Sequence, residues 1–538
     1  MLGKRGRLMP ALIATVSLGL PATLLGSVAP ARASTTPTVS EARLATNIEI
    51  LVYPEDTERL VSLLASARQT LDIVIYEIGG PLVVGQPGAP GALMEAVARG
   101  VKVRVLLNGN WPGKGQPCVA GVNQTRQTQR GCAVSQMSWA YAVRAALTWA
   151  YQHPKPGVQP VRPEVQAANN NFQTTHQKAI VIDGTYRAGP MAGEPRPSSD
   201  LLPTSRAVIS TGNLLAYGWG DTRKSIDWMI DPASTCDGTC PLETQARDFA
   251  AVVSDPVLIP EIARVFRSDY LCGAPPDSDL PSRRNTNALR ATDLPLTWSN
   301  GTLQMPPSSR AFAYPTLTRG YEIPSRGAPQ GNVRERTLAL IQSAQRSLRV
   351  YNEELQDPQI VGALIDASRR LGPGSVRILM TYTPVRDSPQ ETFAPSFQQL
   401  AQAGASIMLS EYAGPGITNS GQLYIHAKVF IADGTDAYVG STNAATASMD
   451  FNRELGIMLT SRPERATLPS HAFAPTALRT LVTTFDRDFA DTTMVTPWSI
   501  IGPATQASDA SDAPGPGIPP WPQTPWPGTV PIACGPLP

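Results

Sequence analysis

The sequence predicts an α/β protein made of two similar halves, each a mixed central sheet flanked by helices, related by a pseudo-twofold axis. Two observations support this prediction. The spacing H-x-K-x4-D occurs twice in the 538 residues, and a matching order of helices and strands precedes each copy. Such alternation is typical of α/β layers. The motif residues are His176, Lys178 and Asp183 in the first copy, and His426, Lys428 and Asp433 in the second.

Apolar periodicity predicts the elements of each half in chain order. The first half contains a helix at 56–69, a strand at 71–78, a helix at 91–100 and a strand at 101–107. The second half contains a helix at 333–344, a strand at 348–355, a helix at 359–370, a strand at 375–382, a helix near 390–403 and a strand at 405–410. The two β-branched motif segments are also predicted as strands.

The duplicated motif is rare for this composition, because the chain has only four histidines and seven lysines. Residues two apart on a strand share a face, so each His and Lys should project together. Two such strands face to face would place two imidazoles and two ammonium groups around a phosphate. One imidazole could attack phosphorus while the other protonates the leaving oxygen. The lysines supply the charge stabilisation, so neither a metal nor another cofactor is required.

Polar residues after each motif predict further donors to the phosphate. The first half has Ser210-Thr211-Gly212-Asn213, and the second has Gly440-Ser441-Thr442-Asn443. Thr211, Asn213, Ser441 and Asn443 are therefore predicted to bind the phosphate, Thr211 less securely because it stands where the second half has serine.

The doubled H-x-K-x4-D with G-S-x-N resembles the phospholipase D superfamily, over about residues 47–488. The segment Ser448–Ile457, SMDFNRELGI, is most similar to the bacterial cardiolipin synthase and phospholipase branch. The resemblance implies a phosphohistidine intermediate, with His176 as nucleophile and His426 as acid and base.

The resemblance also implies an acid that orients each histidine, eleven residues after the motif asparagine. In the second half this count gives Glu454. In the first half it gives Lys224, so Asp227 is the best substitute and Asp221 its rival. The motif aspartates are expected to support the turn after each strand. The strand ends at Tyr76-Glu77 and 351–354 are candidates for the pocket rim or for ordinary exposed strand ends.

Two segments of the first half lack a counterpart in the second. Thr185–Arg206 is rich in Gly, Pro and Ser, leaves directly from the first motif, and is predicted to be a loop beside the pocket. The helix predicted at Ala133–Tyr151 carries four aromatic residues. These could hold lipid at a half-apolar surface, although packing on the core is the stronger expectation.

The chain divides into six predicted segments. These are a secretory signal at 1–33 with cleavage after Ala33, a disordered leader at 34–46, the first half at 47–274, a crossover linker at 275–330, the second half at 331–494, and a Pro-rich tail at 495–538. A membrane anchor is the alternative to the signal. Cleavage would change the net charge from +2 to about −2, which does not favour a general nucleic-acid binder.

Six cysteines in an exported chain predict disulfides. Nearest-neighbour pairing would join 118 to 132, 236 to 240 and 272 to 534, but fifteen pairings are possible. Zinc bound by Cys236 and Cys240 is a weaker alternative, because no further Cys or His lies nearby.

The sequence thus predicts an exported, metal-independent phosphodiesterase that hydrolyses glycerophospholipids, with head-group exchange when an alcohol replaces water. A membrane or micelle surface is the expected partner and a monomer the expected state. A secreted nuclease with the same site is the alternative, and a silent phosphate-binding protein is a third possibility.

Overall fold

The computed structural model describes most of the two predicted halves and little of the segments around them. The described residues are 48–80, 82–108, 136–168, 175–214, 245–272, 297–299, 302–304, 333–381, 394–410, 423–450, 452–466 and 471–499. The predicted signal, the leader and nearly all of the tail lie outside these residues, as do Asp221, Asp227 and the side chains of all six cysteines.

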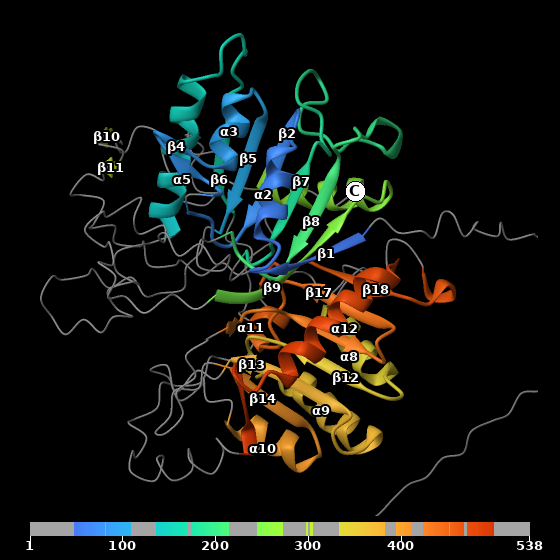
Figure 1. The fold of residues 1–538 in the computed structure, drawn as a ribbon. Coiled ribbons are helices and arrows are strands. Elements are labelled where there is room, and N and C mark those ends of the chain that lie inside the picture. The colour runs from blue at the N-terminus through green and yellow to red at the C-terminus, as the bar shows by residue number, and fades with distance from the viewer. Residues whose placement is uncertain are drawn as a thin grey trace, which may run out of the picture. The chain divides into compact units, whose positions relative to one another are not determined.

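The first half forms a mixed sheet in the order β1-β9-β8-β7-β2-β5-β6 (Figure 1). Its strands are β1 (Ile48–Tyr53), β2 (Thr70–Ile75), β5 (Lys102–Leu107), β6 (Glu164–Ala167), β7 (Ala179–Ile182), β8 (Arg206–Ser210) and β9 (Gln245–Val253). Its helices are α2 (Thr57–Ala65), α3 (Ala92–Ala98), α5 (Gln136–Gln152) and α7 (Leu258–Cys272). A short ribbon, β3 (Gly85–Gln86) with β4 (Ala89–Pro90), leads into α3.

The second half forms a sheet in the order β19-β18-β17-β16-β12-β13-β14-β20. Its strands are β12 (Leu348–Tyr351), β13 (Val376–Thr381), β14 (Ser406–Ser410), β16 (Val429–Ala432), β17 (Asp436–Gly440), β18 (Gly456–Thr460), β19 (Ala472–Phe473) and β20 (Val495–Pro497). Its helices are α8 (Val333–Ser343), α9 (Pro358–Leu371), α10 (Ala394–Gln402), α11 (Thr446–Asp450) and α12 (Pro475–Ala490).

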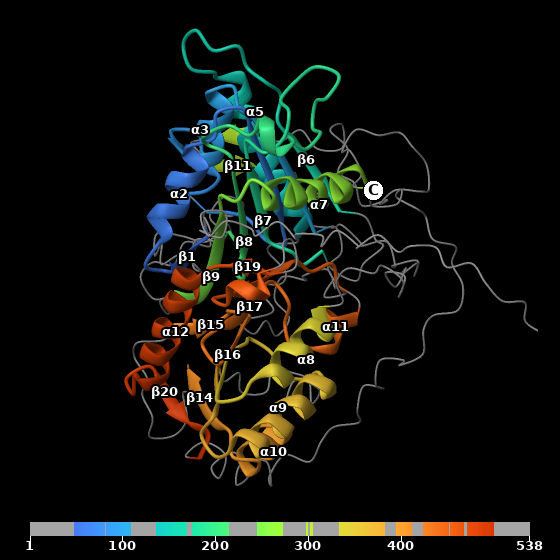
Figure 2. The ribbon, with the colours of Figure 1, turned by 90° about the vertical axis from the view of Figure 1, so that its right-hand side faces the viewer.

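Six strands of each sheet follow the same order and the same pattern of directions. The run β9-β8-β7-β2-β5-β6 matches β18-β17-β16-β12-β13-β14, with antiparallel pairs up to β2 or β12 and parallel pairs beyond. Each sheet carries helices on both faces (Figure 2). The predicted α/β class with two similar mixed sheets is confirmed; the pseudo-twofold relation stays a prediction.

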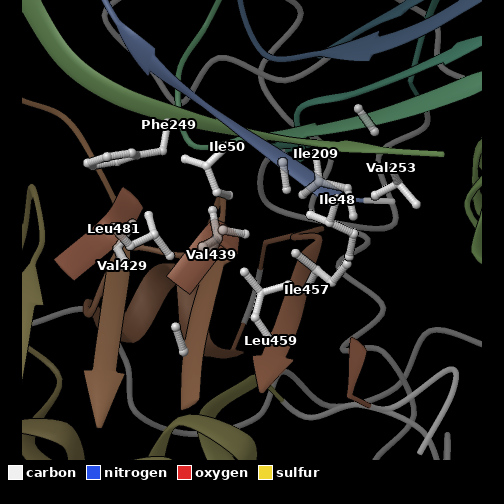
Figure 3. Packing of buried hydrophobic residues seen from close by; sticks show 14 of the residues in the cluster. Ile48, Ile50, Ile209, Phe249, Val253, Val429, Val439, Ile457, Leu459 and Leu481 are labelled. Atoms are coloured by element: carbon white, nitrogen blue, oxygen red, sulfur yellow. The ribbon is translucent and has the colours of Figure 1, made fainter. Parts of the chain in front are cut away.

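One apolar core joins the halves. It takes Ile48, Ile209 and Phe249 from the first half, and Val439 and Leu481 from the second (Figure 3). Helices α7 and α12 contribute to this same cluster, while α2, α3 and α5 cover the other face of the first sheet and α8, α9 and α10 the other face of the second. Burial of such apolar area stabilises by about 25 cal/mol per Å², so a shared core fixes the two motifs against each other.

The motif strands begin later than the sequence predicts, at Ala179 and Val429 rather than at the histidines. The reason is that the backbone before each strand bonds to the other half. His176 N donates to Arg453 O at 2.9 Å, and β15 (Leu423–Ile425), just before His426, pairs with β9 of the first half. The residues that carry the chemistry therefore lie between the sheets.

The segment Thr185–Arg206 does not lie beside His176, contrary to the prediction. It follows Asp183, at the far end of β7, so it is separated from His176 by about seven extended residues, or roughly 23 Å along the strand. Its Arg196 is buried and bonds to Thr185 O at 3.0 Å. The loop is part of the first half's outer end.

The predicted aromatic helix, α5, packs on the core, which was the stronger of the two expectations. Residues Val143, Leu147 and Ala150 of α5 are buried, and Trp149 and Tyr151 pack partly buried against the same cluster. Strand β6, which follows this helix and extends the sheet, was not predicted.

Two further elements fall where none was predicted. The crossover segment contains a small hairpin, β10 (Thr297–Ser299) with β11 (Thr302–Gln304). At the predicted start of the Pro-rich tail, β20 pairs with β14 and buries Val495, and Trp498 after it is buried as well. The second half therefore extends past residue 494.

Of the helices that the structure describes, none is both long and apolar enough to cross a membrane.

Candidate active site

His176 is fixed from two sides by one dipeptide of the second half. Its ring Nδ1 lies 3.0 and 3.1 Å from the carboxylate oxygens of Glu454, and its backbone N donates to the carbonyl of Arg453. The carboxylate holds the proton on Nδ1, which leaves the Nε2 lone pair available. The acid predicted at Glu454 therefore orients the histidine of the opposite half.

His426 is held in the mirrored way by the first half. Its Nδ1 lies 3.0 Å from both carboxylate oxygens of Asp248, and its backbone N donates to Arg247 O at 3.2 Å. Among the described residues Asp248 fills the role predicted for Asp227, and Asp227 itself lies outside those residues. Within the described part of the chain, each histidine is therefore oriented by an acid of the opposite half.

The arginine of each dipeptide, Arg247 or Arg453, bonds to an aspartate on a helix of the other half. Arg247 bonds to Asp488 of α12, with Nε 2.7 Å from Oδ2. Arg453 bonds to Asp269 of α7, with Nε 3.1 Å from Oδ2. Each helix aspartate thus fixes an arginine whose backbone carbonyl accepts the N–H of a motif histidine.

The hydroxyls of Thr211 and Ser441 hold the two acids rather than face a phosphate. Thr211 donates to Asp248 Oδ1 at 2.6 Å, and Ser441 donates to Glu454. Each hydroxyl also accepts the N–H of the residue after the acid, from Phe249 in the first half and from Leu455 in the second. Both side chains are fully buried, and with their single protons committed they orient the acids. The prediction that they bind phosphate is corrected.

The two motif lysines are buried, and the charge of Lys428 acts on Lys178. Lys178 donates to His176 O at 2.7 Å and lies 5.4 Å from the ring centroid of Tyr76. Lys428 donates to His426 O and, at 2.8 Å, to Glu353 Oε2. Burial, followed by the charge of Lys428, lowers the pKa of Lys178 to about 7. The two buried amines therefore lie close enough to interact electrostatically.

The motif asparagines bond to carboxylates at the ends of β2 and β12. Asn213 donates to Glu77 at 2.9 Å, and Asn443 donates to Glu353 at 3.1 Å. Burial raises the pKa of Glu77 to about 8 against the opposing charge of Lys178. Burial also opposes ionisation of Glu353, but the charges of His426 and Lys428 hold its pKa well below the usual range. These strand ends line the site, so the expectation of a pocket rim there agrees with the structure.

Asp183 and Asp433 support backbone at the far ends of the motif strands. Asp183 accepts the backbone N–H groups of Arg68, Gln69 and Thr70, and Asp433 those of Gln345, Arg346 and Ser347. Both residues adopt positive φ, 52° and 55°, a region that aspartate tolerates better than most residues. Neither lies at the histidine end of its strand.

The two motif histidines have different charged neighbours. Burial lowers the pKa of His176 to about 4, opposed by Glu454 and assisted by Lys178. His176 is therefore neutral at pH 7, as a nucleophile must be. Nε2 of His426 instead lies 3.4 Å from the Glu353 carboxylate. Among the described residues, no group of three or more His, Cys, Asp or Glu side chains is arranged to hold a metal ion.

Asp248 was missed because 34 residues separate it from Asn213, where ten separate Glu454 from Asn443. A local signal was nevertheless present. Both acids follow an arginine and precede a run of apolar residues, as Arg-Asp-Phe-Ala-Ala in one half and Arg-Glu-Leu-Gly-Ile in the other. Such a pair before a strand would have identified Asp248 despite the insertion.

Residues 337–473, which include the second motif and Glu454, match the family model described as "Cardiolipin synthase, PLD-like domain". The resemblance to the phospholipase D superfamily is confirmed for this segment, which is about a quarter of the chain. No curated protein matches the chain in sequence.

Solved structures similar to this chain share little sequence with it. Phosphatidylserine synthase from Haemophilus influenzae Rd KW20 is 12% identical, with 84% of this chain and 87% of that chain covered and a TM-score of 0.44. The phospholipase D family member Nuc from Salmonella typhimurium is 18% identical over 32% of this chain and 93% of its own, with a TM-score of 0.23. Polyphosphate kinase from Porphyromonas gingivalis is 12% identical over 86% of this chain, with a TM-score of 0.41, and the chain spans only 53% of that enzyme.

Proposed function

We propose that the protein is a phosphodiesterase that uses His176 as nucleophile and His426 as general acid and base. The observation that carries this proposal is the crossed pair of histidine–carboxylate contacts, His176 with Glu454 and His426 with Asp248. In each contact the carboxylate binds Nδ1, so that Nε2 of the histidine is left for the substrate. The two motif lysines supply positive charge beside the two rings. A phosphodiester is a substrate that requires all four groups at once.

The reaction proceeds in two displacements. Nε2 of His176 forms a bond to phosphorus as the bond from phosphorus to the leaving oxygen breaks, and that oxygen takes the proton from Nε2 of His426. In the second displacement His426 accepts a proton from water, whose oxygen bonds to phosphorus as the phosphorus–nitrogen bond breaks. An alcohol in place of water gives head-group exchange by the same step.

We propose glycerophospholipids as the substrate class, cut on the head-group side of phosphorus, and export as the protein's route. The description of the matching family model, a cardiolipin synthase domain, supports a lipid substrate. The basic, apolar N-terminal sequence ending in Ala31-Arg32-Ala33 supports export. A lipid surface is then the partner, and the internal duplication makes a monomer sufficient.

The test compares substrates in chelator. Purified protein is given phosphatidylcholine vesicles with ethanol in one reaction, and plasmid DNA in another. Phosphatidic acid together with phosphatidylethanol supports the lipid proposal and the covalent intermediate. Nicked DNA with untouched lipid would overturn the lipid proposal in favour of a nuclease. Retention of more than about 1% of turnover by either His176→Ala or His426→Ala would overturn the two-histidine mechanism.

A further inference from the structure

The carboxylate of Glu353 occupies an unexpected place among donors. Its Oε2 lies 2.8 Å from Lys428 Nζ, 3.1 Å from Asn443 Nδ2 and 3.4 Å from His426 Nε2. Its other oxygen accepts the hydroxyl of Tyr424 at 2.6 Å. A single oxygen atom thus receives the lysine, the asparagine and the catalytic nitrogen of the second motif.

In the proposed reaction Lys428 and Asn443 would donate to a non-bridging phosphate oxygen, and His426 Nε2 would donate to the leaving oxygen of the same group. A phosphate oxygen and Glu353 Oε2 cannot both occupy the point where three donors converge. The carboxylate is partly accessible, with 20% of its side chain exposed, whereas Lys428 is fully buried. Glu353 therefore has solvent to move into, and the lysine does not.

The first half shows that a motif lysine does not require such a carboxylate. Val74 pairs with Ala179 and Tyr351 pairs with Val429, each opposite the residue after a motif lysine. Two residues further along the strands, Tyr76 and Glu353 are equivalent. Tyr76 presents its ring to the buried Lys178, at 5.4 Å, and packs edge-on against His176. Glu77 of the first half bonds to Asn213, and among the described residues only the second half has a hydrogen bond between its motif lysine and a carboxylate.

We propose that Glu353 determines what the site accepts: its carboxylate stands where an anionic oxygen of the substrate binds, and the substrate must displace it. The inference rests on the proposed function. The exchange replaces one monoanionic group by another, so a phosphodiester enters without leaving Lys428 unpaired. A neutral ligand would leave that buried lysine without a counterion and is excluded. Tyr424 retains the displaced side chain through Oε1.

The experiment measures the affinity for inorganic phosphate by calorimetry, at a fixed pH near 6, in the full-length protein. Glu353→Gln removes the charge, and Glu353→Asp keeps the charge but is one methylene too short to reach the donors. Both variants should bind phosphate about tenfold more tightly than wild type, because no internal anion has to leave a charge-assisted bond. Glu58→Gln, an exposed residue of α2, is the matched control and should not change the affinity.

Unchanged or weaker binding by Glu353→Asp would overturn the proposal, because a general charge effect alone would then explain any gain in Glu353→Gln. A second measurement needs no variant. In a crystal structure of the wild type with phosphate bound, Glu353 Oε2 should lie more than about 4 Å from Lys428 Nζ, and a retained contact would overturn displacement.

These results separate the inference from the proposed function. Tighter phosphate binding by both variants, with no diester cleaved by the wild type, would support displacement and contradict the phosphodiesterase. Diester cleavage with unchanged phosphate affinity would contradict displacement alone.

Discussion

Replacing Asp248 by Asn tests whether the first half orients the acid and base of the second. Asp248 presents both oxygens to His426 Nδ1 at 3.0 Å and is itself held by Thr211 at 2.6 Å. Asn has the same shape, but it removes the charge and puts an amino group in place of one acceptor. A hydrogen bond to a charged group contributes about 1.5–3 kcal/mol. If that stabilisation is expressed in the transition state, kcat falls by about 10- to 150-fold.

The assay uses a diester with an alkyl leaving group, whose departure requires the proton from His426. A nitrophenyl diester, which leaves without a proton, should show a smaller loss in its first displacement. Asp366→Asn is the matched control, because its carboxylate is 81% exposed and lies on α9. A folded Asp248→Asn protein with kcat within twofold of wild type on the alkyl diester would refute the reasoning.

Two further predictions concern the buried charges. Asp488→Ala leaves Arg247, which is 3% exposed, without its Nε partner, so the free energy of unfolding measured by denaturant titration should fall by about 3–5 kcal/mol. Asp486→Ala on the same helix removes a half-exposed carboxylate and should lower the free energy of unfolding by about 1 kcal/mol or less. Equal losses in the two variants would contradict the account. As pH rises, Lys178 with a pKa of about 7 loses positive charge and Glu77 with a pKa of about 8 gains negative charge, so kcat/KM for a non-titrating diester should fall above about pH 7. A profile that is flat or rising between pH 7 and 9 would contradict that sign.

The fold class could be predicted because short stretches of each half carry the apolar periodicity of its helices and strands. Apolar runs with period two or 3.6 located the central strands of both sheets within a few residues: β2, β5 and β7 in the first, and β12, β13, β14 and β16 in the second. The strand β9 and helix α7 had no such prediction, although they form part of the core that joins the halves. Their counterparts in the second half, β18 and α12, were not predicted either.

The candidate site was predictable where spacing is local and not where insertions intervene. Counting from Asn443 gave Glu454, but the same count from Asn213 failed because the chain between 213 and 248 is longer. The sequence also could not show that each acid serves the opposite histidine, since that depends on how two sheets pack. The hydroxyls of Thr211 and Ser441 were assigned to phosphate for the same reason: their partners lie 37 and 13 residues away in the chain.

The central claim is that His176, oriented by the opposite half, attacks phosphorus. It is tested most directly by quenching the His426→Ala protein during reaction with bis(p-nitrophenyl) phosphate in chelator. The first displacement needs no acid with this leaving group, while the second lacks its base, so the adduct should accumulate. We predict one nitrophenyl phosphoryl group per protein, located at His176 by peptide mass spectrometry. An adduct on another residue, or none while nitrophenolate is released in a stoichiometric burst, would contradict the account.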